Sequence, residues 1–288
     1  MTLSRRQFLL GGAAALAVGG GAAALLDPRD RTRLLESAQG TVDSHLSTPR
    51  LSSGITLTDG SFRSAARGTG VGFTIATPRG ASGPLPLVVL LHGRGGTHRS
   101  AFRGLNMDAA LAEVAKQGKR VALVSVDGGS HSYYHRRADG DDPERMIRDE
   151  LAREVGKRVE LSDRVGLMGW SMGGYGALLL AMRAPDRFHA VAACSAAIWR
   201  RWEDSAPGAF DSRADFASHD LLRDASRGLA TTPVRLVCGR SDPFIATDRA
   251  LAKAVPTIEA HFPQGAHTDV FWRRHNTEQL RFLAARLA

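Results

Sequence analysis

One serine of this sequence lies in a pattern that could carry out nucleophilic chemistry. Ser171 is the central residue of a Gly-x-Ser-x-Gly pattern that runs from Gly169 to Gly173. An apolar stretch, 164–168, precedes the pattern and a helix-forming stretch, 173–184, follows it. In a strand-turn-helix context this pattern predicts a nucleophile elbow, whose sharp turn strains the serine backbone and leaves no room for bulky neighbours. We therefore expect Ser171 to attack a carbonyl carbon.

A serine hydroxyl needs a base to take its proton and an acid to orient that base. Asp242 follows the apolar run 234–238 and His267 lies in the loop after the last expected strand. Both positions fall at the carboxyl ends of strands, where open parallel sheets build their sites. The order serine, acid, histidine is that of the α/β-hydrolase fold. Asp248 and His275 are the weaker alternatives, because each falls inside an expected helix.

The tetrahedral intermediate of acyl transfer needs fixed N–H donors for its negative oxygen. The backbone of Met172, next to the nucleophile, is the first expected donor. The second comes from the loop that begins at His92 and Gly93, which predicts the N–H of Arg94, with that of Gly95 as the alternative. The side chain of Arg94 could reach an acidic substrate group or remain exposed without a specific role.

Other residues are expected to border the substrate from neighbouring loops. A polar segment, 127–142, follows one expected strand, and a longer connection, 196–233, carries two tryptophans. We expect substrate contacts from His92, Gly93, Trp170, Tyr134 and Trp199. The acidic residues and histidines of 127–142 match no spacing typical of a metal site, so the sequence predicts no bound metal.

The remaining chain alternates short β-branched runs with helical stretches, which indicates an α/β fold with a mostly parallel central sheet and helices on both faces. The segment 196–233 is a small insertion after the sixth strand. The expected strands are 55–58, 72–77, 87–91, 121–126, 164–168, 190–193, 234–238 and 259–262. The expected helices are 107–117, 144–159, 173–184, 247–254 and 270–285.

The N-terminal residues are typical of a twin-arginine export signal. Two arginines, Arg5 and Arg6, precede Phe8 and an uncharged run, 10–26, that is rich in alanine and glycine. We expect a signal over 1–26, a linker over 27–54 and a catalytic domain over 55–288. The expected partner is the twin-arginine export machinery and the expected location is the cell envelope or the medium. A retained membrane anchor is the alternative, although the run is short for a membrane span.

The formal net charge is +9, yet the basic residues are dispersed and often adjacent to acids, so we expect no nucleic-acid partner. Two cysteines, Cys194 and Cys238, end apolar runs of the expected sheet. The sequence leaves open whether they are two buried thiols or a disulfide.

The segment from Leu87 to His267 resembles the esterase D-like branch of the α/β hydrolases, which includes S-formylglutathione hydrolases and exported mycolyltransferases. The elbow from Gly169 to Leu178 is the most specific part of the resemblance. It implies carboxylic-ester chemistry through Ser171, Asp242 and His267, without metal or organic cofactor. We expect an exported serine esterase that acts on a small-molecule or lipid ester. An acyltransferase to a sugar or lipid alcohol and a non-catalytic binding protein of the envelope remain the alternatives.

Overall fold

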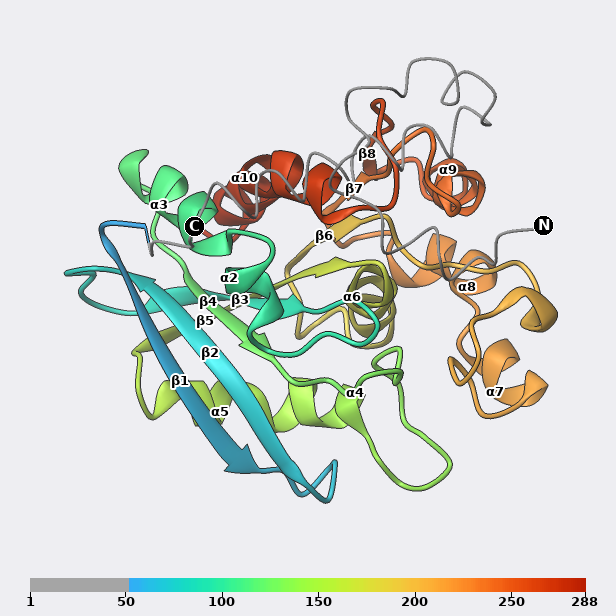
Figure 1. Ribbon diagram of the computed structural model, residues 1–288, viewed down its shortest axis with the longest axis horizontal. Coiled ribbons are helices and arrows are strands. Elements are labelled where there is room, and N and C mark those ends of the chain that lie inside the picture. Colours follow the sequence, from blue (N-terminus) through green and yellow to red (C-terminus); the bar gives the residue numbers. More distant parts are fainter. Residues whose placement is uncertain (1–51) are drawn as a thin grey trace, which may run out of the picture.

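The computed structural model describes residues 52–288, with an eight-stranded sheet at its centre (Figure 1). The expected export signal, 1–26, and residues 27–51 of the expected linker lie outside the described residues. The strands are β1 (Ile55–Arg63), β2 (Gly70–Pro78), β3 (Leu85–Leu91), β4 (Ala122–Val126), β5 (Leu161–Trp170), β6 (Ala190–Cys194), β7 (Val234–Val237) and β8 (Glu259–His261).

The sheet is mostly parallel, as the sequence predicts. Its strand order is β1-β2-β4-β3-β5-β6-β7-β8. The β1–β2 and β2–β4 pairs are antiparallel, and every pair from β4 to β8 is parallel. The six parallel strands therefore end at one edge, and the loops that follow them gather there. All of the expected strands are present, which confirms the α/β fold class.

The edge strand β1 extends five residues beyond the stretch 55–58 that the sequence predicts. Its second half is polar and mostly exposed, so it carries no apolar run that would mark it as a strand. Its backbone nevertheless pairs with β2 along the full length, from Ile55 opposite Pro78 to Arg63 opposite Gly70. Backbone pairing with β2, rather than side-chain burial, therefore sets the length of β1.

Helices cover both faces of the sheet (Figure 1). The side chains of β3 alternate between two apolar cores, with Val88 and Leu90 in one and Leu87 and Val89 in the other, as a strand buried on both faces requires. The first core is closed by α2 (Ser100–Arg103), α3 (Met107–Lys116) and α10 (Asp269–Arg286). The second is closed by η2 (Met146–Leu151), α5 (Ala152–Gly156), α6 (Met172–Arg183), α8 (Leu221–Gly228) and α9 (Ile245–Ala254).

The expected helix over 144–159 has a different form in the structure. It consists of α4 (Pro143–Arg145), a π-helical turn at η2 and then α5. A π turn inserts one residue into the helical repeat, and an apolar pattern of period 3.6 does not reveal such an insertion. The four-residue helix α2 was also not expected, because it is shorter than any pattern that periodicity can detect.

The insertion after β6 contains η3 (Trp202–Asp204), α7 (Arg213–Ser218) and α8. It projects beside the carboxyl edge of the sheet (Figure 1). Among residues 52–288, no helix is both long enough and apolar enough to cross a bilayer.

The two cysteines are free thiols. Cys194 ends β6 and Cys238 follows β7, and both are buried. Burial raises the pKa of the Cys194 thiol to about 12, so the thiol stays protonated at neutral pH. Of the two alternatives that the sequence left open, the structure therefore has the buried thiols.

A buried asparagine of α10 forms hydrogen bonds to β5 and to the loop between α2 and α3. Asn276, in α10, accepts a hydrogen bond from the indole N–H of Trp170 at 2.9 Å and donates one to the carbonyl oxygen of Leu105 at 2.8 Å. Its exposed fraction is 1%. Both partners are thereby satisfied in an apolar environment, where an unpaired polar group is costly.

We predict that Asn276→Leu lowers the free energy of unfolding by about 2–5 kcal/mol, because it leaves one buried N–H and one buried C=O unpaired. Denaturant titration followed by tryptophan fluorescence measures the change. The control is Arg274→Leu, an exposed position of the same helix, which should stay within about 0.5 kcal/mol of the wild type. Equal stability of the two variants would show that the asparagine is dispensable.

Candidate active site

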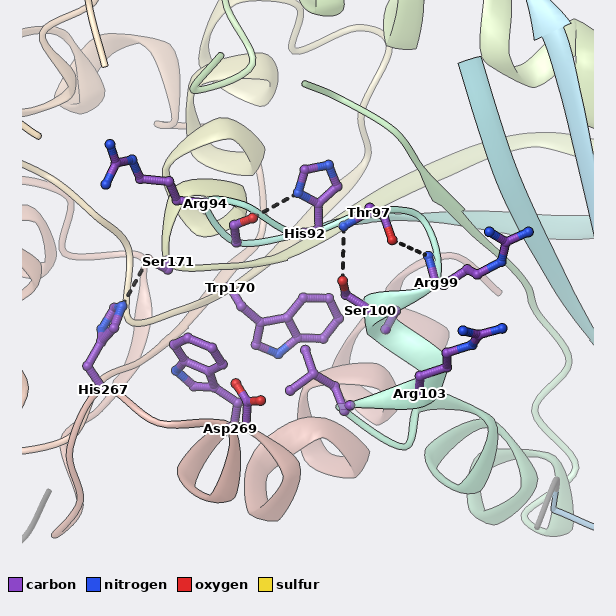
Figure 2. A pocket seen from close by; sticks show the side chains of 16 residues that line it. His92, Arg94, Thr97, Arg99, Ser100, Arg103, Trp170, Ser171, His267 and Asp269 are labelled. Carbon is purple, nitrogen blue, oxygen red and sulfur yellow. Dashed lines mark hydrogen bonds between the residues drawn. The ribbon is translucent and has the colours of Figure 1, made fainter. Parts of the chain in front are cut away.

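The structure brings the serine, the histidine and the acid predicted from the sequence into one hydrogen-bonded line. His267 Nε2 lies 2.9 Å from Ser171 Oγ (Figure 2), and His267 Nδ1 lies 2.9 Å from Asp242 Oδ2. The three residues follow β5, β8 and β7, respectively, at the carboxyl edge of the sheet. This is the geometry in which the histidine can take the serine proton while the acid holds the imidazole.

Ser171 sits in a strained turn. Its φ is 55° and its ψ is −115°, a conformation that non-glycine residues rarely adopt. A Cβ at Gly169 would collide with the carbonyl oxygen of Gly173, and a Cβ at Gly173 would collide with the carbonyl oxygen of Leu91. Only glycine fits at these two positions, which explains the spacing of the pattern. The Ser171 N–H donates to the carbonyl oxygen of Cys194 at 2.9 Å, which anchors the turn on β6.

The acid of the triad is fully buried. Asp242 Oδ1 accepts the N–H of Phe244 at 2.9 Å while Oδ2 faces the imidazole of His267. Two aromatic rings flank that imidazole, Phe244 at 5.3 Å and Trp272 at 5.0 Å between ring centroids. With Nδ1–H directed at the carboxylate, Nε2 presents its lone pair to Ser171, which is the tautomer that a general base requires.

The other two acid and base candidates lie elsewhere. Asp248 is fully buried in α9, where Oδ2 accepts the N–H of Ala196 at 3.1 Å. Burial and the nearby charge of Asp242 hold the pKa of the Asp248 carboxyl well above its usual range. His275 packs on Phe271 in α10 at 4.6 Å between ring centroids. The structure therefore assigns the acid to Asp242 and the base to His267.

The expected oxyanion donors flank the nucleophile. Met172 begins α6, so its N–H has no acceptor within the helix. Of the two donors considered in the loop after β3, Gly95 is engaged, since its N–H donates to the carbonyl oxygen of Ser130 at 2.8 Å. Gly93 approaches the nucleophile closely, and a Cβ there would lie 3.8 Å from Ser171 Cβ. The described loop thus leaves Arg94 as the candidate for the second donor.

His92 and Tyr134 support this loop from within the protein. His92 Nδ1 lies 2.8 Å from the carbonyl oxygen of Gly93, and its Nε2 accepts the N–H of Gly128 at 3.2 Å. The hydroxyl of Tyr134 donates to the carbonyl oxygen of His92 at 3.1 Å, and its ring packs against Gly128 and Gly176. Tyr134 is 0% exposed, so the expectation that it contacts the substrate is wrong. The Tyr134 ring occupies the space beside Gly128 and Gly176 that a side chain at either glycine would fill. The sequence pattern of the loop does not reveal this packing, because Gly176 lies in a different element.

The two tryptophans expected near the substrate differ in position. Trp170 borders the cavity described below, although its side chain is buried and tied to Asn276. Trp199 does not border it. Its ring packs against Tyr133 at 5.1 Å and against Phe244 at 5.6 Å, so Phe244 separates it from the catalytic histidine. The expected contact of Trp199 with substrate in this cavity is therefore corrected to a role in the aromatic packing of the insertion.

A cavity of about 780 Å³ opens at Ser171 and His267 (Figure 2). Its other walls come from the loop after β3, from α2 and from the start of α10. Three arginines lie along the wall, against the single carboxylate of Asp269. They are Arg94, Arg99 and Arg103. His92, Gly93 and Arg94 were expected near the substrate and do line this wall. Sequence reasoning missed Arg99 and Arg103, because α2 has no recognisable sequence pattern and reaches the cavity only through the tertiary fold.

The two buried aspartates predict opposite mutational outcomes. Asp242→Asn should lower kcat for ester hydrolysis about 10⁴-fold, because an amide favours the wrong imidazole tautomer. Asp248→Asn should leave kcat nearly unchanged, because an amide oxygen can still accept the Ala196 N–H and Asp248 makes no contact with His267. Steady-state kinetics with a chromogenic ester measure both variants. A larger loss of kcat in Asp248→Asn than in Asp242→Asn would show that Asp248, and not Asp242, is the acid that orients the histidine.

Comparison with known proteins agrees with this site. The sequence profile of a family described as "Putative esterase" matches residues 64–278. None of the curated protein sequences matches this chain.

Several solved structures share the fold at low sequence identity. A ferulic acid esterase superposes with a TM-score of 0.72 at 18% identity, over 81% of this chain and 99% of its own. An S-formylglutathione hydrolase from Agrobacterium tumefaciens gives 0.68 at 18%, over 83% and 98%. A thermostable esterase from Pseudomonas putida gives 0.63 at 15%, over 94% and 93%.

The family profile spans most of the described chain and includes all three residues of the hydrogen-bonded line. At identities this low, the solved structures establish the fold, while the profile establishes the family. Together with the geometry of Ser171, His267 and Asp242, the match shows that the chain belongs to this esterase family and is a serine esterase.

Proposed function

We propose that this protein is an exported carboxylic-ester hydrolase that works through an acyl-enzyme on Ser171. The observation that carries the proposal is the line of two 2.9 Å contacts from Asp242 through His267 to Ser171 Oγ. The line ends in a cavity large enough for a small ester. Each reacting group is fixed by packing before the substrate arrives, which is the condition for efficient catalysis.

The reaction follows from the positions of these groups. Ser171 Oγ attacks the ester carbonyl carbon as its proton passes to His267 Nε2. The carbonyl oxygen becomes negative and is stabilised by the N–H groups of Met172 and Arg94. The imidazolium, held by Asp242, then gives its proton to the leaving alcohol as the C–O bond breaks. A water molecule repeats the sequence on the acyl-enzyme and releases the acid.

The charge of the cavity wall narrows the class of substrate. Arg94 donates to the carbonyl oxygen of Pro207 at 3.0 Å, and Arg99 pairs with Asp59 at 3.3 Å, whereas Arg103 takes part in none of the ion pairs described for residues 52–288. Because Asp59 balances the charge of Arg99, two guanidinium groups, those of Arg94 and Arg103, remain in the wall. They outnumber the single carboxylate of the cavity, that of Asp269, and this excess of positive charge favours a negatively charged substrate group. We therefore propose that esters with an acidic group are preferred over neutral esters of the same size.

We predict that Ser171→Ala lowers kcat/KM about 10⁶-fold without changing thermal stability, because the hydroxyl is the nucleophile. A panel of 4-nitrophenyl esters of graded chain length measures this.

The same panel includes one pair of esters matched in size, an acidic hemisuccinate and a neutral ester, for which we expect the wild type to have a several-fold higher kcat/KM on the acidic ester. The preference should fall in Arg103→Gln and persist in Arg63→Gln, an exposed arginine outside the cavity.

Two further measurements separate the proposal from its alternatives. Adding glycerol or trehalose and analysing the products distinguishes hydrolysis from acyl transfer, since a transferase would give mainly the new ester. Labelling with a fluorophosphonate probe tests for a reactive serine. Absence of labelling at Ser171 in the folded wild type would contradict the proposed catalysis and favour a binding protein.

Export rests on the sequence pattern at Arg5 and Arg6. We predict that replacing both by lysine retains the full-length chain inside a bacterial host that has the twin-arginine pathway. Fractionation and immunoblotting measure the distribution. The control replaces Arg29 and Arg31 by lysine, outside the expected signal, and should be exported normally. Normal export of the chain that lacks both signal arginines would exclude this route.

A further inference from the structure

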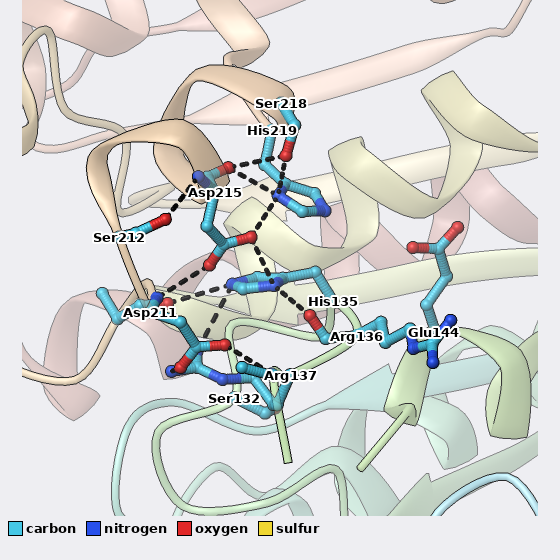
Figure 3. Close-up of polar contacts among 12 residues, drawn as sticks. Ser132, His135, Arg136, Arg137, Glu144, Asp211, Ser212, Asp215, Ser218 and His219 are labelled. Atoms are coloured by element: carbon cyan, nitrogen blue, oxygen red, sulfur yellow. Dashed lines mark hydrogen bonds and ion pairs between the residues drawn. The ribbon is translucent and has the colours of Figure 1, made fainter. Parts of the chain in front are cut away.

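A second cluster of ionisable side chains lies away from the triad, where the insertion meets the loop after β4 (Figure 3). His135 comes from that loop, and Asp215 and His219 come from α7 and the residue after it. One ligand atom from each residue lies within 4.8 Å of the other two. His135 is 0% exposed, and His219 is buried. The cluster joins two segments that are far apart in the sequence.

One carboxylate oxygen lies between the two imidazoles. Asp215 Oδ1 is 3.0 Å from His219 Nδ1 and 3.7 Å from His135 Nδ1. Two donors bound to one zinc ion at tetrahedral angles lie ~3.4 Å apart, so both separations are close to those of a metal site. Backbone oxygens add to the donor set: the carbonyl of Arg136 is 3.0 Å from His135 Nδ1 and that of Asp215 is 2.8 Å from His219 Nδ1.

Both ring nitrogens of His135 face backbone carbonyl oxygens. Its Nδ1 faces the carbonyl oxygen of Arg136 at 3.0 Å, and its Nε2 faces that of Ala209 at 3.0 Å. A neutral imidazole carries one N–H, so in either tautomer a nitrogen lone pair points at a carbonyl oxygen. A metal ion at Nδ1, with Nε2–H donating to Ala209, satisfies both nitrogens.

The groups around the cluster form hydrogen bonds that would orient its three side chains for metal binding. A metal-bound histidine commonly donates its other N–H to a backbone carbonyl, as His135 can to Ala209. Asp215 Oδ2, the oxygen turned away from the cluster, accepts the N–H of Asp211 at 2.8 Å. Arg137 Nη1 comes within 3.4 Å of His135 Nε2, but it donates to the same Ala209 carbonyl at the shorter distance of 2.8 Å. Arg137 also pairs with Asp211 at 2.6 Å, so its charge is balanced.

We propose that His135 Nδ1, His219 Nδ1 and Asp215 Oδ1 bind one divalent transition-metal ion. Two imidazoles and a carboxylate are the donor set typical of Zn²⁺, and the adjacent carbonyl oxygens or water complete its coordination.

The site is structural, because it lies outside the catalytic line. His135 stacks on Phe210 at 5.2 Å between ring centroids, and Phe210 packs against Trp199 at 6.2 Å. Trp199 in turn contacts Phe244, whose ring flanks His267. A metal ion that fixes the insertion to the loop after β4 would therefore hold this aromatic packing beside the catalytic histidine. No residue of the cluster belongs to the line of Ser171, His267 and Asp242, so the ion would take no part in the bond-making steps.

The test uses the full chain without a purification tag, stripped with a chelator and then supplied with Zn²⁺ alone. We expect one bound equivalent by elemental analysis and a Tm that rises with Zn²⁺ concentration. Co²⁺ in place of Zn²⁺ should give visible d–d absorption bands whose intensity reports its coordination. His135→Gln, His219→Gln and Asp215→Asn should each lower the Zn²⁺ affinity at least about 10-fold.

The matched control is His98→Gln. His98 Nδ1 lies 2.9 Å from Asp127, which makes a histidine-aspartate pair without the second histidine of the cluster. This variant should bind Zn²⁺ as the wild type does. Less than about 0.1 equivalent of Zn²⁺ or Co²⁺ on the reconstituted wild type would overturn the proposal. An equal loss of affinity in His98→Gln and the three cluster variants would overturn it as well. If a cluster variant does not fold, the stoichiometry and the cobalt spectrum of the wild type decide the question.

Discussion

The strained backbone of Ser171 is the constraint around which the catalytic edge of the sheet is built. Its positive φ holds the hydroxyl above the strand ends, and this conformation costs about 1–3 kcal/mol. The surroundings offset that cost by packing: Gly169 and Gly173 allow close backbone contact, and the end of β6 and the segment after it form hydrogen bonds to the two sides of the serine. The N–H of Ser171 donates to Cys194 and its carbonyl oxygen accepts from Ala197. The turn is therefore held by the sheet and does not depend on a substrate.

The parallel sheet explains why residues distant in sequence meet at that serine. Loops after β3, β5, β7 and β8 emerge at one edge and carry the candidates for oxyanion donor, nucleophile, acid and base, respectively. The insertion after β6 and the loop after β4 flank them. Phe210 and Trp199 of the insertion pack against one another, and Trp199 contacts Phe244, in the loop after β7, whose ring flanks His267. The orientation of His267 thus depends on packing as well as on its hydrogen bonds.

Two buried aspartates show how surroundings decide the role of a side chain. Asp242 accepts a backbone N–H and faces an imidazole, whereas Asp248 has one backbone donor and the charge of Asp242 nearby. The first is placed to orient the imidazole of His267, and the second makes no contact with that imidazole. The same reasoning separates the two histidine environments, since His267 faces the cavity while His135 is enclosed among carbonyl oxygens.

The sequence by itself determined the fold class, the nucleophile, and the acid and base that accompany it. Those features depend on local patterns: a strand-turn-helix with glycines at set positions, and polar residues directly after apolar strands. Only the tertiary structure decided that Tyr134 is a buried support, that Trp199 packs within the insertion, and that His135 meets His219. These outcomes depend on which loops fold against one another and on how much water remains between them. Residue types and spacing do not encode that information locally, because burial is a property of the assembled neighbours.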